Sequence, residues 1–534
     1  MSERPGVIVA GGGLAGMTAA LRLAERGYRV RLYEQKQILG GDLASRTGKD
    51  GVPLDVYPHM YLSWYRNFWN LIGGVPGVRR EDHFQSFSTV MQLRRGEFPR
   101  TRHITNLYSL RDMVRNLLSG MAPPADMYVA GYSAIDLLAE TLDPTVPLEE
   151  VSVTGFLRAR PYMTDRAADA VDTFITMIWA IPAYLAAADD YRDYLMYSFA
   201  DHDPAYWLAN GSALEQVVAP ITAALRDAGV EIRTSVKVAS VTCEGNGVTE
   251  IGLENGEFDQ DARVWVRETG GWTEKVDELV LAVPPEGLSE LVRSGPPGGS
   301  IVDAAPGLAE VARLRSERIP IVHLYFSDKR KGIPAEPVGM YRSLLALAFT
   351  DISQRWAKST DFGATVLSVS ASNPYALPGT SPEDDGFAIV RELAGYLDFR
   401  AGSAWGDSPD IDWERTIYEP NTDTTLSLNE TGADPWRPVP ACPDVVNLSL
   451  AGDFCRNDVG MMTIESAVTT GLAAAAAIVQ RRGVGEPVEI LTPKKGVPAF
   501  YVWARYAWAP YALAAKAAST GRDLLAGVFR GLES

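Results

Sequence analysis

Four residues near the N-terminus have the types and spacing of a phosphate-binding turn. Gly11, Gly13 and Gly16 form the pattern G-x-G-x-x-G, and Glu34 follows 18 residues after Gly16. The first glycine allows a tight bend, the second lets the backbone approach a pyrophosphate, and the third lets helix and strand pack closely. An acid at the position of Glu34 can accept hydrogen bonds from both hydroxyls of an adenosine ribose. The pattern predicts that the chain binds a dinucleotide.

The segments on either side of the turn are those that such a motif requires. Val7–Ala10 is a short apolar run that predicts a buried strand, and Arg29–Glu34 predicts the next one. Between them, Leu14–Arg26 predicts a helix that opens with Leu14 and Ala15. The N-terminus of this helix would face the phosphates. We therefore expect a β-α-β unit with the glycine turn at its first junction.

Strand patterns return after a helical segment at Ala213–Ala228. They continue to Val283, and the pairs Asn246-Gly247 and Asn255-Gly256 predict hairpin turns among them. Within this region, the stretch Phe258–Lys275 is expected to form an added hairpin arm.

The second half of the chain predicts another sheet and a return to the first one. Ile319–Phe326 and Val366–Ala371 read as strands of another sheet. Val446–Ala451 predicts a strand, and Thr463–Gln480 predicts an Ala-rich helix after it. The predicted fold class is α/β, with mixed α+β character.

Composition excludes several classes of protein. The chain has 534 residues and a net charge of −17, so a nucleic-acid partner, which needs clustered Lys and Arg, is not expected. Its three cysteines are far apart and form no CxxC pair, which favours a reducing, cytoplasmic location. The five histidines are scattered without the spacing of a helical metal pair, so no metal site is predicted.

The longest apolar stretch, Phe174–Ala188, falls short of a membrane span. A bilayer requires roughly 20 consecutive apolar residues, whereas this stretch contains Pro182 and is flanked by Asp172 and Asp189. A buried helix and the wall of a lipid tunnel are both compatible with it.

Two further motifs, one near each end of the chain, accompany the glycine turn. Gly40 and Gly41 follow Glu34, and near the other end Gly452-Asp453 ends a strand shortly before Met462-Thr463 opens a helix. Together with the glycine turn, this arrangement resembles the FAD-dependent amine oxidase and carotene desaturase superfamily. The resemblance implies that Gly452 and Asp453 bind the ribityl–phosphate region of FAD. It also implies that Met462 and Thr463 face the pyrimidine side of the flavin.

Within that superfamily the chain is most similar to plant-type phytoene and zeta-carotene desaturases and hydroxysqualene dehydroxylases. The stretch from His59 through Tyr65 to Asn67 matches their His-x5-Tyr-x-Asn signature, and Arg437 stands in a similar Arg-Pro element. The resemblance implies that His59, Tyr65 and Arg437 act near the substrate. The alternatives are a structural role for His59 and an ion pair with an acid for Arg437.

The same resemblance assigns further contacts to the cofactor. Val238 corresponds to the strand whose backbone contacts adenine, and Ala282 to the strand end beneath the flavin. One departure is Asp42, which stands where many relatives have Lys or Arg. Arg46 is the candidate to replace that phosphate contact.

These likenesses imply a Rossmann-type FAD-binding domain interleaved with a substrate domain. The predicted FAD-binding domain comprises residues 1–75, 205–290 and 440–485, and the substrate domain comprises 76–204 and 291–439 with a mixed sheet and helices. Residues 486–534 form a separate helical tail.

The tail differs in character from the rest of the chain. From Lys494 onward it carries six basic residues against two acidic ones, and Pro510 is expected to divide it into two short helices. Aromatic residues are interleaved with the charges: Phe500, Tyr501, Trp503, Tyr506, Trp508 and Tyr511. This mixture suits a membrane interface. The alternative is an arm packed on its own domain or on a second subunit.

The leading functional prediction is an FAD-dependent oxidoreductase that acts on an apolar isoprenoid or carotenoid-like substrate. Hydride transfer to flavin N5 would be its central step, and a quinone or oxygen would reoxidise the cofactor. A flavin amine oxidase is one alternative, although Thr463 stands where those enzymes carry Tyr. A redox-neutral isomerase and a non-enzymatic prenyl-lipid carrier of the same fold are the others.

Overall fold

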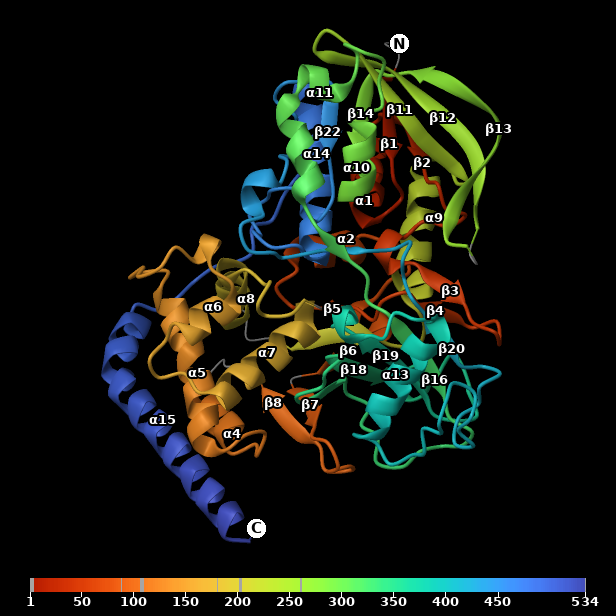
Figure 1. Ribbon diagram of the computed structural model, residues 1–534. Helices are drawn as coiled ribbons and strands as arrows, with labels where there is room; N and C mark the ends of the chain where they lie inside the picture. The colour runs from red at the N-terminus through yellow and green to blue at the C-terminus, as the bar shows by residue number, and fades with distance from the viewer. Residues whose placement is uncertain are drawn as a thin grey trace.

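A five-stranded parallel sheet lies at one end of the molecule (Figure 1). The computed structural model describes residues 4–87, 89–105, 110–179, 181–200, 204–259 and 262–533. The strand order is β10-β2-β1-β14-β22, with bounds β10 Glu231–Arg233, β2 Arg29–Tyr33, β1 Gly6–Ala10, β14 Glu278–Leu281 and β22 Leu448–Leu450. Its strands come from three distant segments of the chain, and the predicted β-α-β unit forms its centre.

Two helices from opposite ends of the sequence pack against each other beside this sheet. They are α1 (Leu14–Ala24) and α14 (Ile464–Arg482). A Cβ on Gly471 would lie 2.4 Å from the Ala15 carbonyl oxygen, so only glycine permits this approach. The close packing joins the C-terminal flavin motif to the N-terminal glycine turn. Further helices of this half are α9 (Ala219–Asp227), α10 (Pro285–Leu291) and α11 (Ile301–Ala304).

A three-stranded antiparallel sheet extends from the same end. It consists of β11 (Val236–Glu244), β12 (Gly247–Asp259) and β13 (Val264–Lys275), and it contains the expected hairpin arm. The predicted turn at Asn255-Gly256 is wrong, because these residues lie inside β12 at a shift in register. A Cβ on Gly256 would lie 2.5 Å from the ring of Trp265, so the glycine accommodates cross-strand packing.

The other half of the molecule is built on a seven-stranded sheet. Its order is β20-β16-β19-β18-β17-β7-β8, antiparallel except where β17 pairs with β7. The bounds are β20 Ile417–Glu419, β16 Ile321–Tyr325, β19 Val366–Ala371, β18 Leu347–Asp351, β17 Val338–Met340, β7 Thr89–Leu93 and β8 Arg102–Thr105. Helix α13 (Pro382–Ala394) packs on it through Ile389 and Leu393. The predicted strands around residues 319–326 and 366–371 are neighbours here.

Short elements join the two halves. They are β3 (Ser45–Thr47), β4 (Pro53–Asp55), β5 (Met60–Tyr61), α2 (Arg66–Gly73), α3 (Arg80–His83), β6 (Phe84–Phe87), β9 (Ala205–Leu208), β15 (Ser316–Glu317), α12 (Ile352–Arg355) and β21 (Leu426–Ser427).

A helical layer covers one side of the seven-stranded half. It contains α4 (Leu110–Leu117), α5 (Pro124–Ala139), α6 (Val153–Arg158), α7 (Asp165–Trp179) and α8 (Ala188–Ala200). The stretch Phe174–Ala188 is therefore not one helix. Pro182 lies in the loop after α7, and Asp172 accepts a hydrogen bond from the Ala183 N–H at 3.0 Å, which folds the loop back. None of the described helices is long and apolar enough to cross a bilayer.

The tail forms one helix, α15 (Phe500–Glu533), along the outside of α5 (Figure 1). The expectation that Pro510 divides it is wrong. Contacts on both sides of the proline hold the helix on α5: Arg505 Nε donates to Asp136 at 2.6 Å, and Ser519 donates to Asp126 at 2.7 Å. Arg505 is buried in this contact, as the alternative of an arm packed on its own domain predicts for this residue.

Candidate functional site

The glycine turn is tightly packed on its inner side and open on the other. Gly11 has φ +106°, and a Cβ there would lie 2.2 Å from the Ala282 carbonyl oxygen. A Cβ on Gly16 would lie 2.0 Å from the Gly11 carbonyl oxygen. At Gly13, by contrast, the nearest atom to a Cβ is 3.9 Å away, on Gly41. The turn thus presents one open backbone face at the N-terminus of α1, which fits the approach of a pyrophosphate.

Glu34 lies beside this turn at the end of β2. Its carboxylate accepts hydrogen bonds from the Gly12 N–H at 2.7 Å and the Lys36 N–H at 2.8 Å. Burial raises the pKa of the carboxyl group. The Glu34 carbonyl also accepts from the Val236 N–H, so β11, which carries the buried Val238, begins next to the predicted ribose acceptor.

The double glycine is brought directly to the turn. Gly40 forms a bridge with Gly13, and its N–H donates to the Gly12 carbonyl oxygen at 2.9 Å. Gly41 has φ +58°, and a Cβ there would lie 3.1 Å from the Gly13 Cα. Backbone rather than side chains therefore surrounds the open face of the turn.

Two acids come close to each other near this face. Burial raises the pKa of Asp453 to about 6. Burial, and then the charge of Asp453, raises the pKa of Asp42 to about 7. Both side chains are half-buried. Gly452, beside Asp453, is held to α14 by hydrogen bonds in both directions with the Thr470 hydroxyl.

The start of α14 is fixed by its own cap and by a neighbouring loop. The Thr463 hydroxyl accepts a hydrogen bond from the Ser466 N–H at 3.2 Å. The Met462 N–H donates to the Asn429 side-chain oxygen at 2.6 Å, and the Asn429 amide donates back to the Met462 carbonyl oxygen. The predicted contact pair therefore lies at a rigid helix N-terminus, where negative charge is stabilised.

Asn67 and Glu465 form a buried junction that the sequence prediction did not include. Glu465 accepts hydrogen bonds from the Asn67 N–H and side-chain amide, both at 2.8 Å, and from the Phe68 N–H at 2.9 Å. Asn67 also exchanges two hydrogen bonds with the backbone of Leu491. Asn67, the asparagine of the predicted signature, therefore links α2 to α14 and to the segment around Leu491 that precedes α15. Its place in the quoted signature was the only available signal.

The three predicted catalytic residues lie in different surroundings. His59 Nδ1 is 2.9 Å from the Tyr57 carbonyl oxygen, and burial lowers the pKa of the ring to about 4. His59 also lines a small cavity of about 20 Å³ with Asp55, His323 and Arg355, enough for one water molecule. Tyr65 is buried at the start of α2, with its ring edge-on to Trp64 at 4.7 Å.

The Arg437 side chain is buried and bonds to other groups of the protein. Its guanidinium donates to the Gly460 carbonyl oxygen at 2.6 Å and to Asp190 of α8 at 3.3 Å. The side chain is 5% exposed. The alternative reading, a pair with an acid, describes this geometry, and Arg437 positions the loop before α14.

Arg46 is likewise bound to neighbouring side chains. It donates to Glu419 and Asp423 at 2.6 Å and to Asn421 at 2.8 Å. These bonds use both terminal nitrogens, so the structure gives the expected phosphate contact no support. Across the described part of the chain, no group of three or more His, Cys, Asp and Glu side chains is arranged to hold a metal ion.

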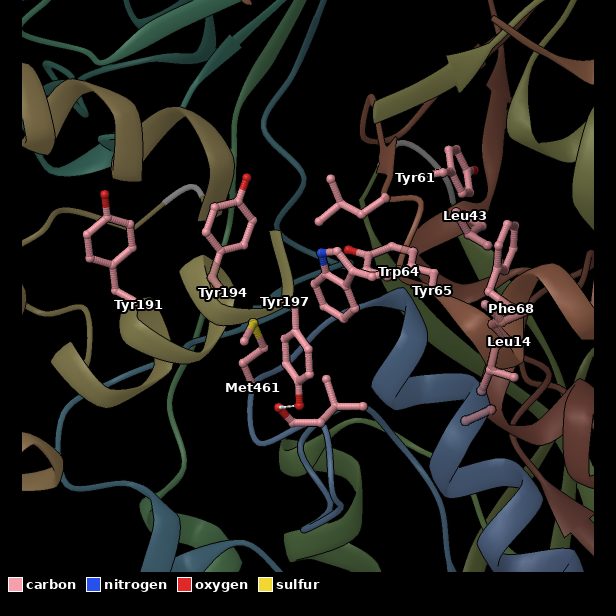
Figure 2. Close-up of a cluster of buried hydrophobic side chains, with 14 of the residues drawn as sticks. Leu14, Leu43, Tyr61, Trp64, Tyr65, Phe68, Tyr191, Tyr194, Tyr197 and Met461 are labelled. Atoms are coloured by element: carbon pink, nitrogen blue, oxygen red, sulfur yellow. Dashed lines mark hydrogen bonds between the residues drawn. The ribbon is translucent and has the colours of Figure 1, made fainter. Parts of the chain in front are cut away.

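A row of buried aromatic side chains, called the aromatic wall below, runs from α8 to Trp64, just before α2. Figure 2 shows Tyr191, Tyr194 and Tyr197 following one another along α8 toward Trp64. The rings of Trp64 and Tyr197 stack at 4.6 Å. Tyr197 also donates to the carbonyl oxygens of Asp458 and Val459, both at 3.0 Å. The wall is therefore tied to the loop that precedes α14.

A glycine turn in a parallel sheet, an acid at the end of the second strand and a returning Gly-Asp segment define a dinucleotide-binding protein of the flavoenzyme type. The family model described as "Flavin containing amine oxidoreductase" matches residues 14–479. The chain belongs to this family and is a flavin-containing oxidoreductase, as the sequence motifs predicted.

Individual relatives extend this finding. The chain is 25% identical over 525 residues to the carotenoid phi-ring synthase of Streptomyces griseus, covering 92% of this chain and 91% of the relative. It is 23% identical over 488 residues to a 15-cis-phytoene desaturase of Glycine max, covering 89% and 79%. A solved oxidoreductase from Methanosarcina mazei shares the fold, with a TM-score of 0.61 and 13% identity over 88% of this chain and 99% of that one.

Proposed function

We propose that this protein is an FAD-dependent oxidoreductase that dehydrogenates an extended, apolar substrate of the isoprenoid or carotenoid class. Two relatives that align along most of the chain are named for reactions on carotenoids or their precursors. FAD is the flavin proposed because the open glycine turn and Glu34 suit the pyrophosphate and ribose of a dinucleotide.

The observation that carries the proposed substrate class is the aromatic wall. Trp64, Tyr191, Tyr194 and Tyr197 are all buried, and Tyr197, which stacks on Trp64, is hydrogen-bonded to the loop before α14. Large rings provide apolar area with little conformational freedom, which suits a long hydrocarbon better than a small polar molecule.

Residues of this chain would hold the cofactor and exclude water from the reaction. Glu34 would accept hydrogen bonds from the ribose, and the N-termini of α1 and α14 would face the pyrophosphate and the flavin ring. When bound, the flavin would supply the two-electron oxidant for loss of a hydride from one substrate carbon and a proton from the adjacent carbon. The buried aromatic wall would position the hydrocarbon and keep this region dry.

His59 is the residue we propose for a polar contact to the substrate. Its low pKa keeps the ring neutral at pH 7, and the interaction of Nδ1 with the Tyr57 carbonyl leaves Nε2 as a proton acceptor. Substitution of His59 by Ala should slow reduction of the flavin by substrate. An unchanged rate in stopped-flow absorbance would assign the residue a structural role.

The residues at the proposed cofactor site count against two of the alternative functions. A flavin amine oxidase would carry Tyr at the position of Thr463, which instead caps α14. A prenyl-lipid carrier would not need the tightly packed Gly11 and Gly16 or the positioned Glu34.

Mass spectrometry on a solvent extract of freshly purified protein tests the proposal. FAD together with a polyene or isoprenoid is the expected result, followed by anaerobic bleaching of the flavin when that compound is added back. A quinone or oxygen should then restore the oxidised spectrum. Lipid without FAD would favour the carrier. Isomerisation of the added compound while the flavin stays oxidised would favour the isomerase.

A further inference from the structure

An arginine-lined hollow lies at the end of the molecule opposite the parallel sheet, far from the glycine turn. Figure 1 places β7, α4, α13 and the C-terminal end of α15 at this end. The hollow has a volume of about 1110 Å³, and among the described residues that line it Glu392 is the acidic one. Six arginines line it: Arg94, Arg95, Arg166, Arg342, Arg391 and Arg522. These six arginines gather on one surface of a chain whose net charge is −17.

The charges in the hollow are not fully balanced by the protein. Four of the six arginines have an acidic partner: Arg166 pairs with Asp523 at 2.7 Å, Arg522 with Asp126 at 3.2 Å, Arg342 with Asp169 at 3.1 Å and Arg94 with Glu97 at 3.5 Å. Glu392 accepts hydrogen bonds from the Ser343 hydroxyl and the backbone of Leu344 and Leu345. The Glu392 carboxylate therefore accepts its hydrogen bonds from the loop after β17.

Arg95 and Arg391 form no ion pair within the described residues. Each lies near an aromatic ring instead: Arg95 is 5.9 Å from the ring of Tyr396, and Arg391 is 5.8 Å from that of Phe387. Both side chains are exposed, and both line the hollow. Their guanidinium groups can donate to phosphate oxygens in pairs.

The start of α5 adds a further feature that favours an anion. The residues Gly120 to Pro124 line the hollow, so the N-terminus of this helix opens onto it. The helix has 16 residues, and its dipole places partial positive charge at this end.

Exposed leucines lie on the lining of the hollow or close to it along the chain. Leu344, which lines the hollow, is 70% exposed, and Leu118, two residues before Gly120, is 71% exposed. Leu524 and Leu525, just beyond Arg522, are 68% and 62% exposed. Single exposed leucines are ordinary, but each of these lies on or within three residues of the lining. Cations beside exposed leucines match the depth profile of a membrane surface, with phosphates outside and acyl chains below.

We propose that this hollow binds the phosphate of an anionic phospholipid headgroup while the surrounding leucines enter the acyl boundary. The site is separate from the flavin region and goes beyond the proposed function. A lipid is the proposed ligand, rather than a free phosphate ion, because the leucines would gain nothing from a soluble anion. The exposed side chains of Trp503, Tyr506 and Tyr511 extend an interfacial surface along α15.

Vesicle sedimentation of the full-length, flavin-loaded protein tests this proposal. Wild-type protein should bind vesicles of phosphatidylcholine with phosphatidylglycerol much more tightly than vesicles of phosphatidylcholine alone, and salt should weaken the binding. Arg95→Gln with Arg391→Gln should weaken it by about tenfold or more, because each basic residue near an anionic surface contributes appreciably. Leu524→Ser with Leu525→Ser should weaken it as well.

Arg313→Gln is the matched control, since Arg313 is 60% exposed on the flavin-side half. It should bind as wild type does, and flavin absorbance should show that all variants are folded. Equal binding to both kinds of vesicle, or wild-type binding by both double variants, would overturn the proposal. Displacement by inorganic phosphate at concentrations that leave other salts without effect would also overturn it, in favour of a soluble phosphate ligand.

Discussion

One carboxylate, Glu34, is the residue we propose to bind the adenosine ribose of the cofactor beside the glycine turn. Glu34 receives the Gly12 N–H at 2.7 Å, so its side chain is already oriented beside the turn. Arg at this position would remove the ribose acceptor and place a long cation in its place.

We therefore expect Glu34→Arg to lower FAD occupancy by about tenfold or more, the loss expected when a charge-assisted hydrogen bond is removed. Flavin absorbance per protein is the measurement. Glu231→Arg is the control, because Glu231 is exposed on the edge strand of the same sheet. Full flavin content in the Glu34 variant would refute the assigned role.

A second carboxylate makes stability depend on pH. The pKa of Asp42 is raised to about 7, by burial first and then by Asp453. The folded state therefore holds this proton more tightly than the unfolded state does, and the contribution of Asp42 to stability falls as the pH rises from about 4 to about 7.

The variant Asp42→Asn lacks this dependence. Its free energy of unfolding, relative to wild type, should increase across that pH window and level off above it. Urea unfolding at a series of pH values measures this difference. Asp227→Asn, at an exposed position of α9, should show a constant difference. A constant difference for Asp42→Asn as well would show that the carboxyl group titrates normally.

Helix α15 is attached to the helical layer in part through one buried cation. Arg505 donates to Asp136 at 2.6 Å and to the Asp143 carbonyl oxygen at 2.7 Å, and it also pairs with Glu140. The Tyr132 hydroxyl donates to the backbone carbonyl oxygen of Arg505 at 2.6 Å.

Arg505→Gln should cost about 3–5 kcal/mol, because it leaves buried acids without this partner. Limited proteolysis should then release α15 faster while the flavin stays bound. Lys516→Gln, which removes one exposed hydrogen bond to the Pro161 carbonyl, should be cleaved at the wild-type rate. Equal cleavage of the two variants would mean that apolar packing alone holds the helix.

The two halves of the molecule are joined by a cluster of charges around Asp423. Lys36, Arg46 and Arg263 all bond to this acid, at 3.0, 2.6 and 2.8 Å. Lys36 and Arg46 follow the β-α-β unit, Arg263 lies in the hairpin arm, and Asp423 follows β20 of the seven-stranded sheet. Although burial opposes it, the three cations hold the pKa of Asp423 well below its usual range.

Asp423→Asn should destabilise the protein by about 3–5 kcal/mol, since Arg46 and Arg263 would keep only Glu419 as an acidic partner and Lys36 would lose its acidic partner. Asp423 is 2% exposed, and Asp398→Asn, at an exposed position, is the control with little expected effect. Urea unfolding measures both. A small effect at Asp423 would show that the halves are held by apolar contacts.

Local patterns predicted the flavin-side elements well. The glycine turn, the β-α-β unit and the helix beginning near Thr463 follow from apolar periodicity and from positions that only glycine can occupy. These signals act within a few residues, so they can be read from the sequence without knowing the tertiary contacts. The distant motifs at Gly40 and Asp453 were placed by their resemblance to a family.

Contacts between distant segments decided the rest. Pro510 was expected to break the tail, but bonds to α5 on both sides of it keep one helix. Arg46 was expected near a phosphate, and the acids that it pairs with, Glu419 and Asp423, come from far along the chain. The arginine-lined hollow draws on segments from both halves of the sequence. Residue type and spacing report the short-range forces, whereas the partners of a charged or exposed side chain are set by which segments the packing of the whole chain brings together.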